Sequence, residues 1–166
     1  FGHEFIFTEG LVGGIAIEKT GSALPDETIK LCEESDAILF GTIGDPKYDN
    51  DPKAKVRPEQ GILGLRKEMQ LYANIRPIYT FDKLVGKSPL KPEIAKGVDF
   101  VVVRELVSGI YFGKRGFNEN RTYAFDTAEY HKDEIVRVAK FAFEIAQKRK
   151  KKLTVVDKAN VLDTSR

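Results

Sequence analysis

Short apolar runs and longer amphipathic stretches follow one another along this chain, and their periods predict strands and helices. Apolar runs predict strands at residues 4–8, 37–40, 75–80, 99–105 and 153–157. The run at 37–40 is continuously apolar and those at 99–105 and 153–157 have apolar centres, which is typical of buried strands. We expect the run at 37–40 to be a parallel strand, because a helix precedes it.

Helical periods fall between these runs. They predict helices at residues 11–17, from 25 to about 35, from 59 to about 74, and at 133–147. The third helix should end before Pro77, since the residue before a proline avoids helical geometry. Strands and helices in alternation predict an α/β architecture.

The predicted helix that begins near Glu59 carries an unusual mixture of side chains on one face. Residues at i, i+3, i+4 and i+7 share that face, namely Glu59, Ile62, Leu63 and Arg66. Arg76 follows close behind. A core helix needs no arginines around its apolar stripe, whereas a pocket for an anionic ligand with an aliphatic tail does.

Composition excludes several classes of protein. The 166 residues carry a net charge of +2 and are 31% charged, so nothing in the balance favours nucleic acid. The basic run at 148–152 suits the solvated C-terminus of a helix. The apolar runs are too short to span a bilayer. Cys32 has no partner for a disulfide within the chain, and a reducing cytoplasm is the expected compartment.

Polar groups at the ends of predicted strands form a candidate site: Glu59, Arg66, Arg76, Arg104, Tyr111, Lys158 and Asn160. Three arginines can grip two carboxylates, and a lysine and a tyrosine can exchange protons. Spacing alone leaves a rival open, in which the arginines form surface salt bridges and the tyrosine is packed. Arg104 either pairs with Glu105 or meets a ligand anion.

Four segments carry a family resemblance across nearly the whole chain. They read GGIAIEKTGSALPDETIKLCEESDAILFGTIGDPKYD, RPEQGILGLRKEMQLYANIRP, GVDFVVVRELVSGIYFG and TVVDKANVLDTSR. The chain resembles the 3-isopropylmalate dehydrogenases of the β-hydroxyacid oxidative decarboxylase family, which also includes the isocitrate dehydrogenases. The resemblance implies NAD-dependent oxidative decarboxylation of 3-isopropylmalate to 4-methyl-2-oxopentanoate in leucine biosynthesis. It also implies a divalent metal, Mg²⁺ or Mn²⁺, and a cytoplasmic homodimer.

The resemblance implies a role for each matching residue. Tyr111 and Lys158 are the expected catalytic residues, with Tyr111 protonating the enol and Lys158 reaching the active site of the partner subunit. The expected substrate-binding residues are Arg66, Arg76, Arg104, Glu59, Ile62 and Leu63. The expected cofactor-binding residues are Asp45, Pro46, Lys47, Glu59 and Asn160. Glu59 favours an alkyl substrate, because it would repel a third substrate carboxylate.

The implied fold has two domains with parallel or mixed sheets, of which only part is present here. Residues 1–71 would belong to the cofactor-side domain. Residues 72–166 would belong to the substrate and dimer-interface domain, with residues 114–130 as a hairpin or projecting arm. The chain has no initiator Met, and we expect it to be an internal portion of a longer protein.

Two departures from the family pattern stand out. The usual Gly-Gly-Pro-Lys-Trp-Asp loop reads Gly-Asp-Pro-Lys-Tyr-Asp here, so Asp45 adds a charge near the expected cofactor. The metal-binding aspartates are expected downstream, and without them this stretch alone should be inactive. Two alternatives stay open. One is a sister enzyme acting on tartrate, D-malate or homoisocitrate, and the other is a non-catalytic module that dimerises through the arm.

Overall fold

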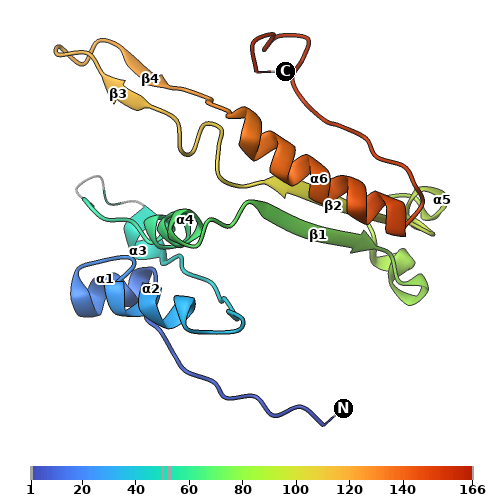
Figure 1. Cartoon of the computed structure of the whole chain (residues 1–166), viewed down its shortest axis with the longest axis horizontal. Helices are drawn as coiled ribbons and strands as arrows, with labels where there is room; N and C mark the ends of the chain where they lie inside the picture. Colours follow the sequence, from blue (N-terminus) through green and yellow to red (C-terminus); the bar gives the residue numbers. More distant parts are fainter. Residues whose placement is uncertain (1, 50, 52–53, 166) are drawn as a thin grey trace. The chain divides into compact units, whose positions relative to one another are not determined.

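The computed structural model describes residues 2–49, 51 and 54–165 of the chain (Figure 1). These fall into two compact units, Phe1–Gln70 and Leu71–Arg166, each with its own internal packing. Helices and strands both contribute, and the predicted α/β class is confirmed.

The first unit is helical. It contains α1 (Gly14–Thr20), α2 (Asp26–Glu33), α3 (Pro46–Asp49) and α4 (Glu59–Glu68). Pro25 stands at the N-cap of α2, and Asp26 and Glu27 in the first turn complement the positive end of the helix, as predicted. The buried side chains are mostly small: Ala16, Ala23, Thr28, Cys32, Pro58 and Leu65. Burial raises the pKa of the Cys32 thiol, so this cysteine is packed rather than reactive.

Two glycines allow the elements of this unit to approach closely. Gly13 has a φ of 71°, and a Cβ there would lie 2.6 Å from the Cβ of Ile43. A Cβ on Gly61 would lie 2.7 Å from the carbonyl oxygen of Ala23 and 2.9 Å from a methyl of Val12. Only glycine fits either position without moving backbone. Helix α4 therefore packs through Gly61 against the segments on either side of α1, at Val12 and at Ala23.

The second unit is built on an antiparallel ribbon with a helix on one face. It contains β1 (Ala73–Tyr79), the 3₁₀ helix η1 (Asp82–Lys87), α5 (Pro92–Ala95), β2 (Asp99–Glu105), β3 (Arg115–Phe117), β4 (Ala124–Asp126) and α6 (Lys132–Lys148). Strands β1 and β2 pair from Ala73 with Glu105 to Tyr79 with Asp99. Helix α6 lies along β2 (Figure 1). Its predicted amphipathic character is confirmed by the burial of Val138.

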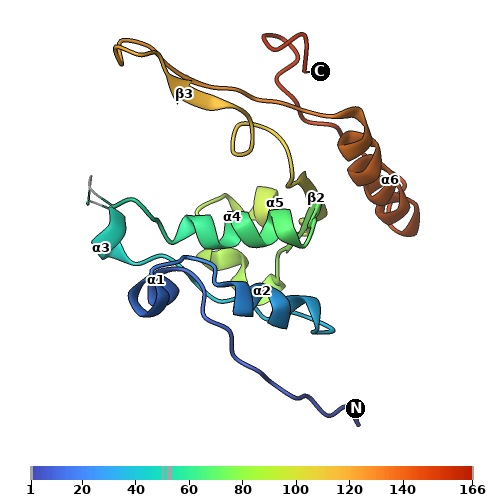
Figure 2. The same ribbon diagram turned by 60° about the vertical axis from the view of Figure 1, so that its left-hand side comes forward.

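The predicted hairpin is present in this unit. Strands β3 and β4 pair antiparallel, Arg115 with Asp126 and Phe117 with Ala124. Figure 2 shows the hairpin projecting beyond the N-terminal end of α6. The predicted arm is therefore a real structural element, while its proposed role in dimerisation stays a prediction.

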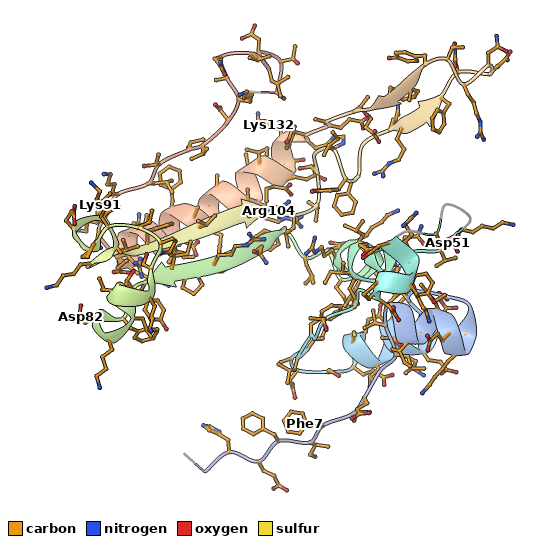
Figure 3. All side chains as sticks on the ribbon, turned by 180° about the vertical axis from the view of Figure 1, so that it is seen from behind. Phe7, Asp51, Asp82, Lys91, Arg104 and Lys132 are labelled. Carbon is orange, nitrogen blue, oxygen red and sulfur yellow. The ribbon has the colours of Figure 1, made fainter. Side chains whose placement is uncertain are left out.

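Three predicted strands are wrong. Residues 4–8, 37–40 and 153–157 have extended or irregular backbone with no strand assignment. Their apolar side chains are exposed, with Ile6 at 92%, Leu39 at 89% and Val156 at 90%. Phe7 lies on a segment that points away from the helices of its unit (Figure 3). Each run has strand propensity, but no neighbouring strand pairs with it among the described residues, and a strand needs a hydrogen-bonded neighbour.

Smaller corrections concern boundaries and burial. Helix α4 ends at Glu68 rather than near residue 74, and Gln70 then adopts a φ of 50°. The predicted helix at 11–17 begins later, at Gly14. Strand β2 has the predicted bounds but is not buried on both faces, because α6 covers only one face of a two-stranded ribbon. In the parts that the structure describes, no helix has the length and apolarity to span a membrane.

Candidate active site

The face of α4 that carries the candidate side chains points away from the core of its unit. Gly61 and Leu65 occupy the buried face. The opposite face leaves Glu59 exposed and Ile62, Leu63 and Arg66 half-buried. The two aliphatic side chains are therefore available to a ligand on the surface of the first unit, with a charge on either side of them.

The loop that carries the expected cofactor residues is held by ionic contacts. The Asp45 carboxylate accepts the backbone N–H of Lys47 at 3.0 Å, as a capping residue does at the start of α3. The Lys47 ammonium pairs with the carboxylates of Glu18 and Asp45. Asp45, the departure from the family pattern, thus gives the loop a cap and a second partner for Lys47.

Two candidate arginines share the outward face of the β1–β2 ribbon. Arg104 stands opposite Asn74, and Arg76 stands opposite Val102. Residues two apart on a strand, and residues opposite each other across a ladder, point to the same side. The Nε of Arg76 donates to the side-chain oxygen of Asn74 at 2.6 Å. Asn74 is therefore hydrogen-bonded to Arg76 and stands opposite Arg104 on the same face.

Sequence reasoning missed Asn74, because it assigned this residue to the end of a helix. The signal that locates it is the alternation of the following strand, in which Asn74 and Arg76 are two residues apart. Once β1 is known to begin at Ala73, the amide belongs on the face of Arg76.

Tyr111 lies beside Arg104, as the sequence predicts. The guanidinium carbon of Arg104 is 5.9 Å from the centre of the Tyr111 ring, within the range of a cation–π contact. Tyr111 is 56% exposed, so it is not a packed core residue. The phenol and the guanidinium are open to solvent at one place on the second unit.

Glu105 does not pair with Arg104. Its carboxylate accepts the backbone N–H groups of Val107 and Ser108 and the hydroxyl of Ser108. Across the described residues, Arg66, Arg76 and Arg104 form no ion pair with a carboxylate. The described residues therefore give no support to the rival interpretation of three surface salt bridges, and within them these guanidinium groups can still bind an anionic ligand.

Lys158 and Asn160 lie in a turn beyond α6, and both are exposed. The Lys158 carbonyl oxygen accepts the N–H groups of Val161 and Leu162 at 3.0 and 2.9 Å. Within the described part of the second unit, no hydrogen bond, ion pair or ring contact joins Lys158 or Asn160 to Arg104 or Tyr111. The structure brings Arg76, Arg104 and Tyr111 together but leaves these two residues separate.

Part of the basic run after α6 is paired within the unit. Arg149 and Lys150 both form ion pairs with Asp99 at the start of β2, and the Lys150 ammonium also donates to the Asp99 carbonyl at 3.0 Å. The hydrogen bond from Arg149, with help from Lys150, holds the pKa of the Asp99 carboxyl below its ordinary value of 3.8. These two cations fasten the end of α6 to β2.

Comparison with known protein families identifies the family of the chain. A family profile described as isocitrate/isopropylmalate dehydrogenase matches residues 1–166. The chain belongs to this family. The resemblance drawn from the four sequence segments is therefore confirmed.

Individual members of the family are similar over the full chain. A 3-isopropylmalate dehydrogenase from Aquifex aeolicus is 58% identical over 99% of this chain and 46% of its own length. One from Bacillus caldotenax is 54% identical over 100% of this chain and 46% of its own length. The chain thus spans a little under half the length of these curated relatives.

Solved structures of the same family share the fold. An isocitrate dehydrogenase from Methylococcus capsulatus superposes with a TM-score of 0.72 at 28% identity, over 92% of this chain and 42% of that one. A β-decarboxylating dehydrogenase from Thermococcus kodakarensis gives a TM-score of 0.58 at 32% identity, over 92% of this chain and 40% of that one. The expected family fold is confirmed, and this chain forms part of it.

Proposed function

We propose that the whole protein oxidises and decarboxylates 3-isopropylmalate with NAD, giving 4-methyl-2-oxopentanoate in leucine biosynthesis. The observation that carries this proposal is the identity of 50–58% to curated 3-isopropylmalate dehydrogenases from several bacteria. The similarity covers 99–100% of the chain, including every residue assigned to the candidate site.

The outward face of α4 supports an alkyl substrate. Ile62 and Leu63 are half-buried and keep apolar surface to offer a branched alkyl group. Burying a side chain of that size against them is worth about 1.5–3 kcal/mol. Glu59 opens the helix beside them and repels a third carboxylate, so the face selects 3-isopropylmalate over isocitrate or homoisocitrate.

The arginines support a substrate with two carboxylates. Arg76 and Arg104 share one face of the ribbon and have no carboxylate partner among the described residues. Together with Arg66, they would hold the two acid groups through forked, charge-assisted hydrogen bonds. Tyr111 lies beside Arg104, and we assign it the proton donated to the enol once carbon dioxide has left. We assign the removal of the substrate hydroxyl proton to Lys158.

The proposal includes two cofactors. NAD accepts the hydride when bound, and Asp45, Pro46, Lys47, Glu59 and Asn160 are the residues proposed to border it. The ionic contacts of Lys47 would keep that loop in place for the cofactor. Within the described ranges, no group of three or more His, Cys, Asp or Glu residues could hold a metal ion. The residues present do not by themselves fit Mg²⁺ or Mn²⁺, and no step is assigned to the metal.

We also propose that the enzyme works as a cytoplasmic homodimer. The projecting β3–β4 hairpin offers a second copy of the chain a contact surface. The single cysteine is buried and free, which suits a reducing compartment. Lys158 would then act in the active site of the partner subunit.

A substrate panel tests the proposal. The whole protein, with NAD and Mg²⁺ or Mn²⁺, is offered 3-isopropylmalate, isocitrate, homoisocitrate, D-malate and tartrate, and NADH formation is followed at 340 nm. We expect kcat/KM for 3-isopropylmalate to exceed the others by about 100-fold or more, the scale of selection that pocket contacts achieve. Background turnover on 3-isopropylmalate with clear turnover on another acid would overturn the substrate assignment.

A further inference from the structure

We propose that Glu105 is a positioning residue, which fixes the place of Tyr111 beside Arg104 without touching the substrate. This inference rests on the proposed function, since it assigns a role within the same site. The inference goes beyond the proposed function because Glu105 is not among the residues proposed to bind substrate or cofactor.

The hydrogen bonds of Glu105 close a tight turn between the two site residues. One carboxylate oxygen accepts the N–H of Val107 at 2.7 Å. The other accepts the N–H and the hydroxyl of Ser108, at 3.1 and 2.7 Å. A carboxylate that accepts three hydrogen bonds within three residues leaves the chain little freedom there. Strand β2 ends at Glu105 itself, so this turn fixes the direction in which the chain leaves the strand.

The next turn depends on this direction. Gly109, buried and with a φ of 80°, donates its N–H to the Glu129 carbonyl oxygen at 2.7 Å and accepts the N–H groups of Phe112 and Gly113. The Arg115 guanidinium holds the Tyr111 carbonyl oxygen. Two consecutive turns therefore reverse the chain and return the Tyr111 ring to Arg104. The first of them depends on the Glu105 side chain.

The two site residues respond differently to loss of this turn. Arg104 is held by the β1–β2 ladder, opposite Asn74, whether or not Glu105 makes its bonds. Tyr111 has no such support from a strand. Glu105→Gln removes the charge and one of the two acceptor oxygens, because the amide nitrogen cannot accept. We therefore expect Tyr111, and not Arg104, to lose its place.

This difference yields a kinetic signature that a merely structural role would not produce. In the whole protein, Glu105→Gln should lower kcat on 3-isopropylmalate about tenfold and change KM less than about twofold, because the proton donor is displaced while carboxylate binding persists. In a Tyr111→Phe background the same change should have almost no further effect, since interacting residues are not additive. The matched control is Glu134→Gln at the start of α6. It likewise replaces a carboxylate that accepts a backbone N–H, and it should keep wild-type kcat.

A spectroscopic readout separates this inference from the proposed function. In protein labelled with 3-fluorotyrosine, the ¹⁹F signal of Tyr111 is assigned by its absence in Tyr111→Phe. Glu105→Gln should shift or broaden that signal while the other tyrosine signals remain. An unmoved Tyr111 signal, or a kcat equal to that of the wild type, overturns the inference. Wild-type protein that does not turn over 3-isopropylmalate overturns the proposed function instead, and the ¹⁹F result still decides the role of Glu105.

A second variant covers the case in which Glu105→Gln fails to fold. Ser108→Ala removes only the hydroxyl that donates to Glu105 at 2.7 Å. The two backbone N–H groups still donate to the Glu105 carboxylate, so a milder loosening of the turn is expected. We expect kcat to fall about threefold and the Tyr111 signal to shift in the same direction. No change in either quantity overturns the inference.

Discussion

The Arg104 guanidinium and the Tyr111 ring meet at 5.9 Å although they are carried by different kinds of structure. Arg104 belongs to strand β2, which is paired along its length, whereas Tyr111 belongs to the loop that follows. A group suited to hold a carboxylate and a group suited to deliver a proton are thereby placed side by side in the second unit.

Removal of the Tyr111 hydroxyl tests this division of roles. Tyr111→Phe should lower kcat on 3-isopropylmalate about 100-fold with little change in KM, because general acid catalysis is typically worth 10²–10⁴-fold and the arginines still bind the substrate. Steady-state kinetics on the whole protein measure this. The control is Tyr79→Phe at the end of β1, which removes only the hydroxyl of a ring that packs edge-on against Phe81 and should have no effect. A Tyr111→Phe enzyme with wild-type kcat would remove the phenol from the chemistry.

The α4 face should select the substrate by its alkyl group. Ile62→Ala should lower kcat/KM for 3-isopropylmalate by about 10- to 100-fold and affect D-malate much less, because only the larger substrate contacts this side chain. Competition between the two substrates in one assay gives the ratio directly. Leu84→Ala, which shortens an exposed aliphatic residue of η1, is the control. An equal loss on both substrates would count against selection by α4.

Helix α4 should tolerate a methyl group at one glycine and not at another. Gly61→Ala places a Cβ 2.7 Å from the Ala23 carbonyl oxygen, so backbone must move, at a cost of about 1–3 kcal/mol. Gly64→Ala meets only the end of the Leu24 side chain at 3.0 Å, and it gains about 1 kcal/mol of helix propensity. Urea unfolding should therefore rank Gly61→Ala clearly below Gly64→Ala. Equal midpoints would contradict the close packing of α4.

The fastening of α6 to β2 should depend on pH. The pKa of Asp99 lies below its ordinary value of 3.8 because Arg149 and Lys150 favour the carboxylate. A lowered folded-state pKa stabilises the fold above 3.8, and this stability is lost as the pH falls through the lower folded value. Thermal unfolding should show that Asp99→Asn is less stable than the wild type at pH 7. The two proteins should be equally stable at a pH low enough to protonate Asp99 in the folded protein. A difference in stability between Asp99→Asn and the wild type that persists unchanged in acid would refute the ion pairs. Asp36→Asn is the control and should not show this dependence on pH.

Local signals located α2, α6 and β2. Pro25 followed by two acidic residues marks the start of α2, and the amphipathic period marks α6 within one residue at each end. The bounds of β2 follow from its apolar run. These features depend on residues that are close together in the sequence, so they can be predicted from local patterns. The proximity of Tyr111 to Arg104 was also predictable, because only six residues separate them in the sequence.

Features that depend on distant neighbours could not be predicted in the same way. The run at 37–40 has the same apolar character as β2, but no strand pairs with it in the described parts of the chain, and apolar pattern does not report a partner. The role of Asn74 depends on where α4 ends, which is at Glu68, about six residues before the end that its apolar pattern indicates. The three hydrogen bonds of Glu105 leave no mark on the sequence at all.

The central claim, oxidation coupled to decarboxylation of 3-isopropylmalate, is tested most directly by product stoichiometry. The whole protein is incubated with 3-isopropylmalate, NAD and Mg²⁺, and NADH, carbon dioxide and 4-methyl-2-oxopentanoate are quantified together. We expect equal amounts of all three. NADH formed without carbon dioxide, or no product from 3-isopropylmalate at all, would contradict it.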